Sequence, residues 1–329
     1  MFILRVHLVP KIIFHAGIGQ LHKNTLLRLD RTIRETIRLW LKLPKDTPTA
    51  FFHTRAREGG LQIWQLDKWI PLLKERQRQR LLNSVHPIIT HMRVMTPNFV
   101  GKAILPTIDG NVCKTKEDLY KYTSESLYRK LDGKGLKYSK NMPSNHTWKI
   151  HGTKLQTGKS FVSSIKVHGN LLATQARSAR GRNETPMCNA GCNSRASLSH
   201  IAQACVRTHF NRVKRHDALV KFLDDRLQQL GFSTIIEPKI RTPAGLRKPD
   251  LVAHNGTQAY VIDAQVINDV DDPDTTFQQA KALQHHRYSG LGSEKNQSNP
   301  HSILHIYIQL ERVYVQCICR GPKRTGAHK

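Results

Sequence analysis

Hydrophobic positions recur at helical spacing in the first third of the chain. In the segment LDRTIRETIRLWLKLP they fall on one helix face, at Leu29, Ile33, Ile37, Trp40 and Leu41. A proline follows, where a helix would stop, so we expect an amphipathic helix within residues 20–44. A second helical pattern covers residues 61–95 and continues beyond the charged run KERQRQR, which we interpret as a solvated helix face.

The last third of the chain combines helical and strand-like patterns. A stripe that includes Val213, Val220 and Leu223 predicts a helix of about 20 residues that ends at Gly231. Strand-like segments follow (STIIEPKI, LRKPDLVAHN and QAYVIDAQVI), then the helical segment TTFQQAKALQHHRY, then the alternating segments ILHIYIQL and VYVQCICR. Strands interleaved with helices predict an α/β layer fold over residues 211–320.

The charge of the chain points to a polyanionic partner. Its 329 residues correspond to about two domains. They include 52 Lys and Arg against 24 Asp and Glu, a formal net charge of +28 that is typical of binding to phosphates. Between Arg129 and Arg182 there are twelve Lys and Arg and one acid, Asp132. Because the apolar periodicity weakens there, we interpret this segment as a basic connector with short structured pieces and no compact core.

The apolar stretches of the chain are too short for a membrane. No run of 18 or more apolar residues occurs, which excludes an ordinary spanning helix. Charged residues also interrupt the apolar N-terminal segment MFILRVHLVPKIIFHAG, unlike the core of a signal peptide. We expect a soluble intracellular chain without a membrane partner.

Three of the six cysteines cluster with a histidine. The members are Cys188, Cys192, His200 and Cys205. The first two form a CxxxC motif, seven residues separate it from the histidine, and four residues separate the histidine from the last cysteine. Zinc prefers four thiolate and imidazole ligands in a tetrahedral arrangement. A segment with so few apolar side chains to bury needs such a metal site to hold its fold. We therefore predict a structural zinc knuckle; the alternative is a chance cluster in a basic loop. Cys317 and Cys319 fit core thiols on a strand.

A second group of residues is suited to metal-dependent phosphodiester hydrolysis. The motif KPD, which ends at Asp250, is followed thirteen residues later by Asp263, which shares a strand face with Gln265. Lys281 and Tyr288 are seven residues apart on the next helical segment and share a face. Carboxylates are hard ligands that suit magnesium, and a nearby lysine stabilises charge on the phosphate. Alternatively, Asp250 caps a turn, Asp263 pairs with an arginine and Lys281 is solvated.

Basic residues lie beside both candidate sites. Five are candidates for nucleic-acid contact, namely Arg180 and Arg182 in RSARGR, Arg212 and Arg215 after the knuckle, and Lys248 in the KPD motif. His209 and His216 share the helical spacing of Arg212, which predicts a basic helix face that touches phosphates.

These features resemble the C-terminal half of the polyprotein of site-specific non-LTR (type-1) retrotransposable elements of the R-two type, which insert into ribosomal RNA genes. The resemblance rests on LDRTIRETIRLWLKLPKDTPTAFFHTRAREGGLQI, RSARGR, the CCHC cluster with THFNRVKRH, and the KPD and Asp263 segments. It implies an α plus α/β fold class with five parts: a thumb-like helical region (1–100), a basic linker (101–182), a CCHC zinc knuckle (183–210), a restriction-endonuclease-like α/β domain (211–320) and a basic tail (321–329).

The resemblance also implies an activity. It is a DNA endonuclease of the PD-(D/E)xK class that nicks target DNA in the nucleus to prime reverse transcription, with target DNA at the ribosomal RNA gene locus and element RNA as partners. Asp250 and Asp263 would hold magnesium, Lys281 would be the catalytic lysine, and Tyr288 would take an accessory aromatic position. The general nuclease pattern places a lysine where this chain has Gln265, whereas the family that it resembles places its lysine on the following helix, which suits Lys281.

The parent polyprotein would be an RNA-directed DNA polymerase whose palm is expected before Met1. The one formal aromatic-x-Asp-Asp match, Phe222 to Asp225, lies in a helical pattern and is rejected as a polymerase motif. Two other functions stay open. One is a catalytically silent zinc-knuckle module that binds nucleic acid, and the other is a standalone zinc-finger regulator, which would leave the α/β domain without a task.

Overall fold

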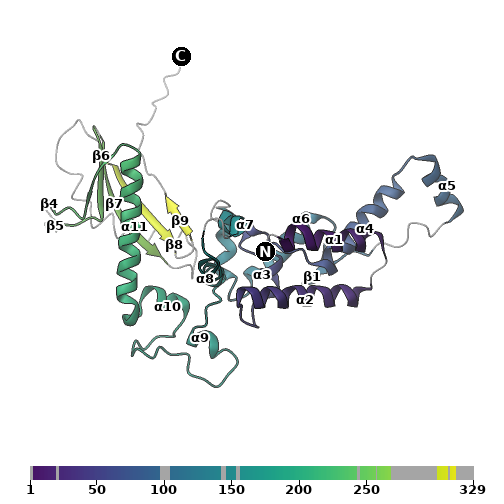
Figure 1. The fold of residues 1–329 in the computed structure, drawn as a ribbon, viewed down its shortest axis with the longest axis horizontal. Helices are drawn as coiled ribbons and strands as arrows, with labels where there is room; N and C mark the ends of the chain where they lie inside the picture. Colours follow the sequence, from purple (N-terminus) through teal and green to yellow (C-terminus); the bar gives the residue numbers. More distant parts are fainter. Residues whose placement is uncertain are drawn as a thin grey trace, which may run out of the picture. The chain divides into compact units, whose positions relative to one another are not determined.

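The computed structural model describes residues 3–19, 22–96, 104–141, 146–152, 156–242, 245–256, 258–267, 302–309 and 312–315. Two compact units make up the chain, Met1–Ala173 and Thr174–Lys329. Both contain helices and small sheets, so the predicted mixture of α and β structure is confirmed (Figure 1). Within the described ranges, every helix is too short or too polar to traverse a bilayer.

The first unit is mainly helical. Its elements are η1 (Leu4–Leu8), α1 (Val9–Ile18), α2 (Lys23–Leu41), α3 (Thr49–His53), η2 (Ala56–Glu58), α4 (Leu66–Leu82), α5 (Pro87–Met95), β1 (Thr107–Ile108), β2 (Asn111–Val112), α6 (Lys116–Tyr128), η3 (Lys134–Asn141), α7 (Thr147–His151) and α8 (Gly158–His168). Helix α2 confirms the predicted amphipathic helix, because it buries Ile33 and Ile37. The pattern over residues 61–95 forms two helices, since Pro87 starts a new helix after a turn.

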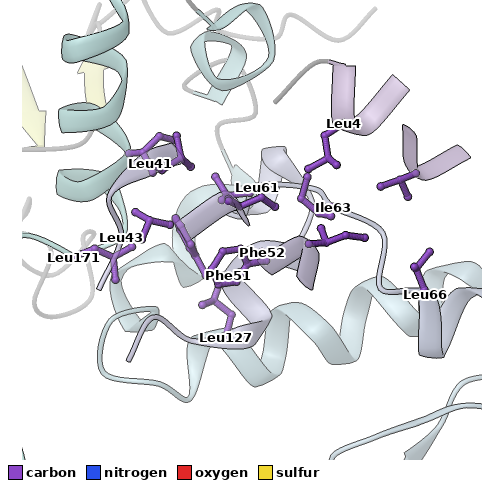
Figure 2. Close-up of a cluster of buried hydrophobic side chains, with 14 of the residues drawn as sticks. Leu4, Leu41, Leu43, Phe51, Phe52, Leu61, Ile63, Leu66, Leu127 and Leu171 are labelled. Atoms are coloured by element: carbon purple, nitrogen blue, oxygen red, sulfur yellow. The ribbon is translucent and has the colours of Figure 1, made fainter. Parts of the chain in front are cut away.

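The core of the first unit gathers side chains from α2, α3, α4, α6 and α8. Phe51 and Phe52 lie among the labelled leucines of this cluster, close to Leu127 (Figure 2). Each phenylalanine is at most 1% exposed, so burial of its ring stabilises the unit by about 1.5–3 kcal/mol. This core holds α2 and α4 together.

Part of that core comes from the segment interpreted as a basic connector. Leu136, Phe161 and Ile165 lie between Arg129 and Arg182, and all three are buried in the cluster of the first unit. The expectation of a segment without a compact core is therefore wrong for these residues. The reason is physical: Phe161 and Ile165 lie one turn apart on α8, so this short helix within the basic segment has a buried face of its own that joins the core.

A buried carboxylate connects two helices of the first unit. The two carboxylate oxygens of Asp30, on α2, accept the backbone N–H groups of Leu66 at 2.9 Å and Asp67 at 3.0 Å. These are donors that the first turn of α4 leaves without a helical partner. Burial, with the Asp67 carboxylate nearby, raises the pKa of Asp30 to about 7. Asp30 thus caps α4 from a neighbouring helix.

The second unit contains the remaining elements. They are α9 (Gln175–Ser178), α10 (Leu198–Gln203), η6 (Val206–Thr208), α11 (His209–Gln229), β3 (Ser233–Ile236), β4 (Ile240–Thr242), β5 (Gly245–Arg247), β6 (Leu251–Asn255), β7 (Gln258–Ile267), β8 (Ser302–Gln309) and β9 (Arg312–Val315). The predicted helix after the knuckle and the three strand-like segments that follow it are confirmed. Phe222 to Asp225 lie within α11, where Leu223 is buried, which agrees with their rejection as a polymerase motif.

The main sheet of this unit has the strand order β3-β6-β7-β8-β9. Its pairs are antiparallel except β7 and β8, which run parallel. A parallel pair requires a crossover connection of a dozen or more residues, and residues 268–301 provide that length. The predicted helix TTFQQAKALQHHRY falls in this connection and lies outside the described residues.

Helix α11 packs against β3, β6 and β7 of the sheet (Figure 1). Its buried residues Val220 and Leu223 meet Leu251, Ala253 and Ile262 in one apolar cluster, with Ala264 at the end of it. The helix therefore has a fixed position over the strands that bear the KPD motif and Asp263.

Candidate functional site

Short-range structure brings the Cys and His cluster together. Cys188 donates its N–H to the carbonyl of Ser194 at 2.8 Å, and Met187 bridges to Arg195, so the first two cysteines lie on a tight hairpin. Gly191 at its tip has φ +73°, a conformation that suits glycine. The hydroxyl of Ser197 then caps α10 by accepting the N–H of His200 at 3.1 Å, which sets His200 in the first turn.

The four ligand atoms lie close enough to share one metal ion. They are all within 4.8 Å of one another. The Cys205 sulfur is 3.7 Å from that of Cys188 and 4.0 Å from that of Cys192. Tetrahedral bonds of about 2.3 Å to zinc would separate two sulfurs by about 3.8 Å. The Nε2 atom of His200 is buried and accepts no hydrogen bond in the described part of the chain, as expected of an atom reserved for a metal.

Little besides these ligands holds the knuckle together. Its buried cluster consists of Cys188, Ala196 and Cys205, with Ala190 and Cys192 partly buried beside it. Such small side chains provide little hydrophobic stabilisation, so the donor set and the lack of a core both fit a structural metal.

Two arginines of α11 hold the end of α10. Arg212 donates to the carbonyls of Gln203 and, at 3.4 Å, Cys205, while Arg215 donates to the carbonyl of Ala202 at 3.1 Å. These carbonyls lie at and just beyond the C-terminus of α10, where a helix leaves acceptors unpaired and favours cations. We call these contacts the arginine clamp. In the structure, both guanidinium groups are thus engaged with the backbone, and their predicted contact with phosphates stays a prediction.

The two candidate aspartates lie on neighbouring segments, Asp250 just before β6 and Asp263 in the middle of β7. Asp250 immediately precedes β6, whose first residue, Leu251, is in register with Ile262 on β7. Asp263 is the next residue of β7, so antiparallel pairing puts it beside Asp250. Asp250 also accepts the backbone N–H of Ala264 through Oδ2 at 2.7 Å. The register therefore makes Asp250 and Asp263 neighbours along the backbone, whereas Lys281 and Tyr288 lie outside the described residues.

A histidine that sequence reasoning had assigned elsewhere joins this pair. The Nε2 atom of His216, on α11, donates to Asp250 Oδ2 at 3.1 Å. This hydrogen bond and the charge of Asp250 raise the pKa of His216 to about 9, although partial burial opposes the shift. The pair is therefore an ion pair at neutral pH. The signal in the sequence was the spacing of His216, which fits the apolar stripe of Val213 and Val220. The prediction that His216 faces phosphate did not identify Asp250 as its partner.

The other basic candidates lie on the surface. Lys248 forms an ion pair with Glu237 at 2.6 Å, and both side chains are about half exposed. Arg182 lies 3.6 Å from Glu184 and is also exposed. Arg180 follows α9, where its N–H donates to the carbonyl of Arg177 at 3.1 Å. These positions leave Lys248 and Arg182 accessible to a partner.

Comparison with known proteins identifies relatives of the chain. No protein-family model matches it. It is 34% identical over 284 residues to the Retrovirus-related Pol polyprotein from type-2 retrotransposable element R2DM of Drosophila melanogaster, a match that covers 84% of this chain and 26% of the relative. It is 32% identical over 278 residues to the Retrovirus-related Pol polyprotein from type-1 retrotransposable element R2 of Nasonia vitripennis, covering 83% of this chain and 26% of that protein. A third relative, of the same name from Bradysia coprophila, is 29% identical over 278 residues, with 80% of this chain and 31% of the relative covered. The chain thus spans about a quarter of the length of the first two relatives.

Proposed function

We propose, from the premise that this chain belongs to the R2-type Pol polyproteins and matches part of their length, that it is the segment of the polyprotein that cuts target DNA. In this proposal the second unit is a metal-dependent DNA endonuclease of the PD-(D/E)xK class with a structural zinc knuckle. The nick would prime reverse transcription by the polymerase activity of the parent polyprotein, in the nucleus. Residues 1–100, within the first unit, would then be the thumb-like region.

The observation that carries the proposal is the pairing of β6 with β7, whose register puts two acidic residues at neighbouring backbone positions. Asp250 precedes β6, and Asp263 lies one residue beyond the Ile262 partner of Leu251. In the described part of the chain, Oδ2 of Asp250 accepts both hydrogen bonds, which leaves Oδ1 for another ligand. The side chain of Asp250 is 17% exposed, so part of it reaches the surface. Hard carboxylate oxygens with this access are donors that suit magnesium.

Each residue then has a task in the reaction. Asp250 and Asp263 would hold magnesium, which supplies Lewis-acid polarisation of the scissile phosphate when bound. The Ala264 N–H keeps the Asp250 carboxylate oriented. Lys281 is proposed to stabilise the charge that develops on the phosphate, with Tyr288 beside it. The charge on the DNA backbone would be met by Lys248, Arg180 and Arg182.

The zinc knuckle is proposed to be part of the surface that holds nucleic acid. Cys188, Cys192, His200 and Cys205 would hold one zinc ion, for which their spacing and chemistry are suited. The excess of 28 positive charges supports nucleic acid as the partner, which we propose to be target DNA at the ribosomal RNA gene locus and element RNA.

A plasmid-nicking assay in magnesium tests the proposed activity. We expect the chain to convert supercoiled DNA to the open circle, and Asp263→Ala to abolish this, because metal coordination and charge stabilisation disappear together. The matched control is Asp225→Ala, an exposed aspartate on α11 with no role in the site. An Asp263→Ala protein that nicks DNA at the parental rate would refute the endonuclease.

One observation favours the second candidate, a catalytically silent nucleic-acid-binding module. Asp250 already has a cationic partner in His216, which gives this carboxylate a structural role without a metal. In that case the chain binds DNA and RNA through the knuckle and basic residues, and no metal restores nicking to any variant. The same nicking assay separates the two functions.

A further inference from the structure

We infer that His216 is a positioning residue, which holds the Asp250 carboxylate in the orientation that a metal ion needs. The inference rests on the proposed endonuclease function and adds a residue to its site. His216 does not touch the metal or the DNA in this arrangement. It acts through Asp250, with which its ring Nε2 shares a hydrogen bond of 3.1 Å.

The first argument is the geometry at Asp250. This residue lies outside the strand, just before β6, where a carboxylate that makes no contacts rotates among several side-chain conformations. Two donors from different elements converge on one of its oxygens, Oδ2: the N–H of Ala264 on β7 and the ring of His216 on α11. Two donors fix the plane of the carboxylate as well as its position. Within the described residues both donors use Oδ2, so Oδ1 stays available to a further ligand.

The second argument is that the position of His216 is itself fixed. Its Nδ1 lies 3.3 Å from a carboxylate oxygen of Asp217, so both ring nitrogens have acceptors. One turn after it, Val220 is buried against the sheet. Just before it, Arg215 belongs to the arginine clamp on α10. The helix is thus anchored on both sides of His216, which allows the ring to position the carboxylate.

The third argument is a general property of metal sites. Groups that hydrogen-bond a ligating carboxylate set its orientation, and their loss typically weakens metal affinity or activity by about 10- to 100-fold. A plain structural ion pair would behave differently. It would contribute to the stability of the fold, but folded protein without it would bind the metal normally.

Two substitutions of the same chemistry separate these roles. In His216→Gln the amide nitrogen occupies nearly the position of Nε2 and retains the hydrogen bond to Asp250. In His216→Asn the amide is one methylene shorter and does not reach. We would measure the dissociation constant of Mn²⁺ by calorimetry on the full chain without DNA, then the single-turnover nicking rate of plasmid DNA, and the DNA affinity. The controls are His254→Gln and His254→Asn, at an exposed histidine on β6.

We expect His216→Asn to weaken Mn²⁺ binding by about 10- to 100-fold and His216→Gln to restore most of it, with DNA affinity unchanged. Both His254 variants should behave like the parent. Equal Mn²⁺ binding by His216→Asn and the parent, or equal losses in the Asn and Gln variants, would overturn the inference. Failure of the proposed function gives a different result. The parental chain itself would bind no Mn²⁺, and Asp263→Ala would change neither Mn²⁺ binding nor nicking. The positioning role of His216 would then be refuted as well.

A measurement on the parental chain decides the matter if His216→Asn does not fold. Ring ¹⁵N NMR of His216 reports whether its N–H remains hydrogen-bonded while Mg²⁺ is titrated. Persistence of that hydrogen bond in the metal-bound protein is the expected result. A ring that leaves Asp250 when the metal binds would refute the positioning role.

Discussion

Replacement of both Arg212 and Arg215 by alanine tests whether the arginine clamp holds the knuckle against α11. The two side chains donate three hydrogen bonds to carbonyls at the end of α10. Alanine removes all three and leaves those carbonyls without their partners. The perturbation should therefore loosen α10, the helix that carries the ligand His200, without touching any ligand directly.

The expected magnitude follows from the chemistry of these bonds. A hydrogen bond to a charged group contributes about 1.5–3 kcal/mol, and partial exposure of both arginines reduces this to about 1 kcal/mol each. The three bonds together then stabilise the closed state of α10 by about 3 kcal/mol. Since about 1.4 kcal/mol corresponds to a factor of ten, local opening should become more frequent by on the order of 100-fold.

Hydrogen exchange followed by mass spectrometry measures this opening directly. Peptides that cover α10 should exchange on the order of 100-fold faster in the double variant, while peptides from β6 and β7 exchange as in the parent. The matched control is Lys214→Ala with Lys221→Ala. It removes the same charge from exposed positions of the same helix. Unchanged exchange of α10 in the Arg double variant would refute the clamp.

The same pair of variants separates the clamp from phosphate contact. If Arg212 and Arg215 neutralised duplex phosphates, the salt dependence of DNA binding would weaken by a slope of about 0.9 for each contact. If the arginines only form the clamp, the salt-dependence slope of the Arg212 and Arg215 double variant should change no more than that of the Lys214 and Lys221 control. A slope that falls only in the Arg variant would restore their predicted role as nucleic-acid ligands.

Three further outcomes follow from the structure. The chain should bind one zinc per molecule, and Cys205→Ser should lower this stoichiometry in elemental analysis, because four ligands converge on one point; an unchanged zinc content would contradict the assignment. Asp30→Ala should lower the free energy of unfolding of the first unit by about 2 kcal/mol, measured by denaturant titration, since α4 loses its cap; an unchanged denaturation midpoint would contradict this. Burial lowers the pKa of His53 to about 4, so the unfolded state binds more protons below pH 6.5. The free energy of unfolding should therefore be highest above pH 6.5, where His53 is neutral in both states, and should fall as the pH drops towards 4. The variant His53→Gln should show a smaller fall over the same pH range.

Local periodicity made the main helices and strands predictable. Helix α2 and strands β6 and β7 follow from spacing alone, because each needs one apolar face against a core. The buried Leu136, Phe161 and Ile165 were missed. Phe161 and Ile165 share the buried face of α8, a stripe too short to stand out against the surrounding basic sequence.

The candidate site also has a part that local spacing predicts and a part that it does not. The Cys and His cluster was predictable because its four members lie within a segment of 18 residues, Cys188 to Cys205, whose spacing is visible in the sequence. The contact between His216 and Asp250 spans 34 positions, and no spacing rule connects a helix to the loop before a strand. What the sequence does offer is His216, a polar residue at the spacing of the apolar stripe of α11; its side chain is partly buried, a position that favours a polar partner. In a chain with few acids, a carboxylate near the sheet is the natural candidate for that partner. Helix α11 contributes polar side chains to both candidate sites. Arg212 and Arg215 contact carbonyls at the end of α10, and His216 contacts Asp250.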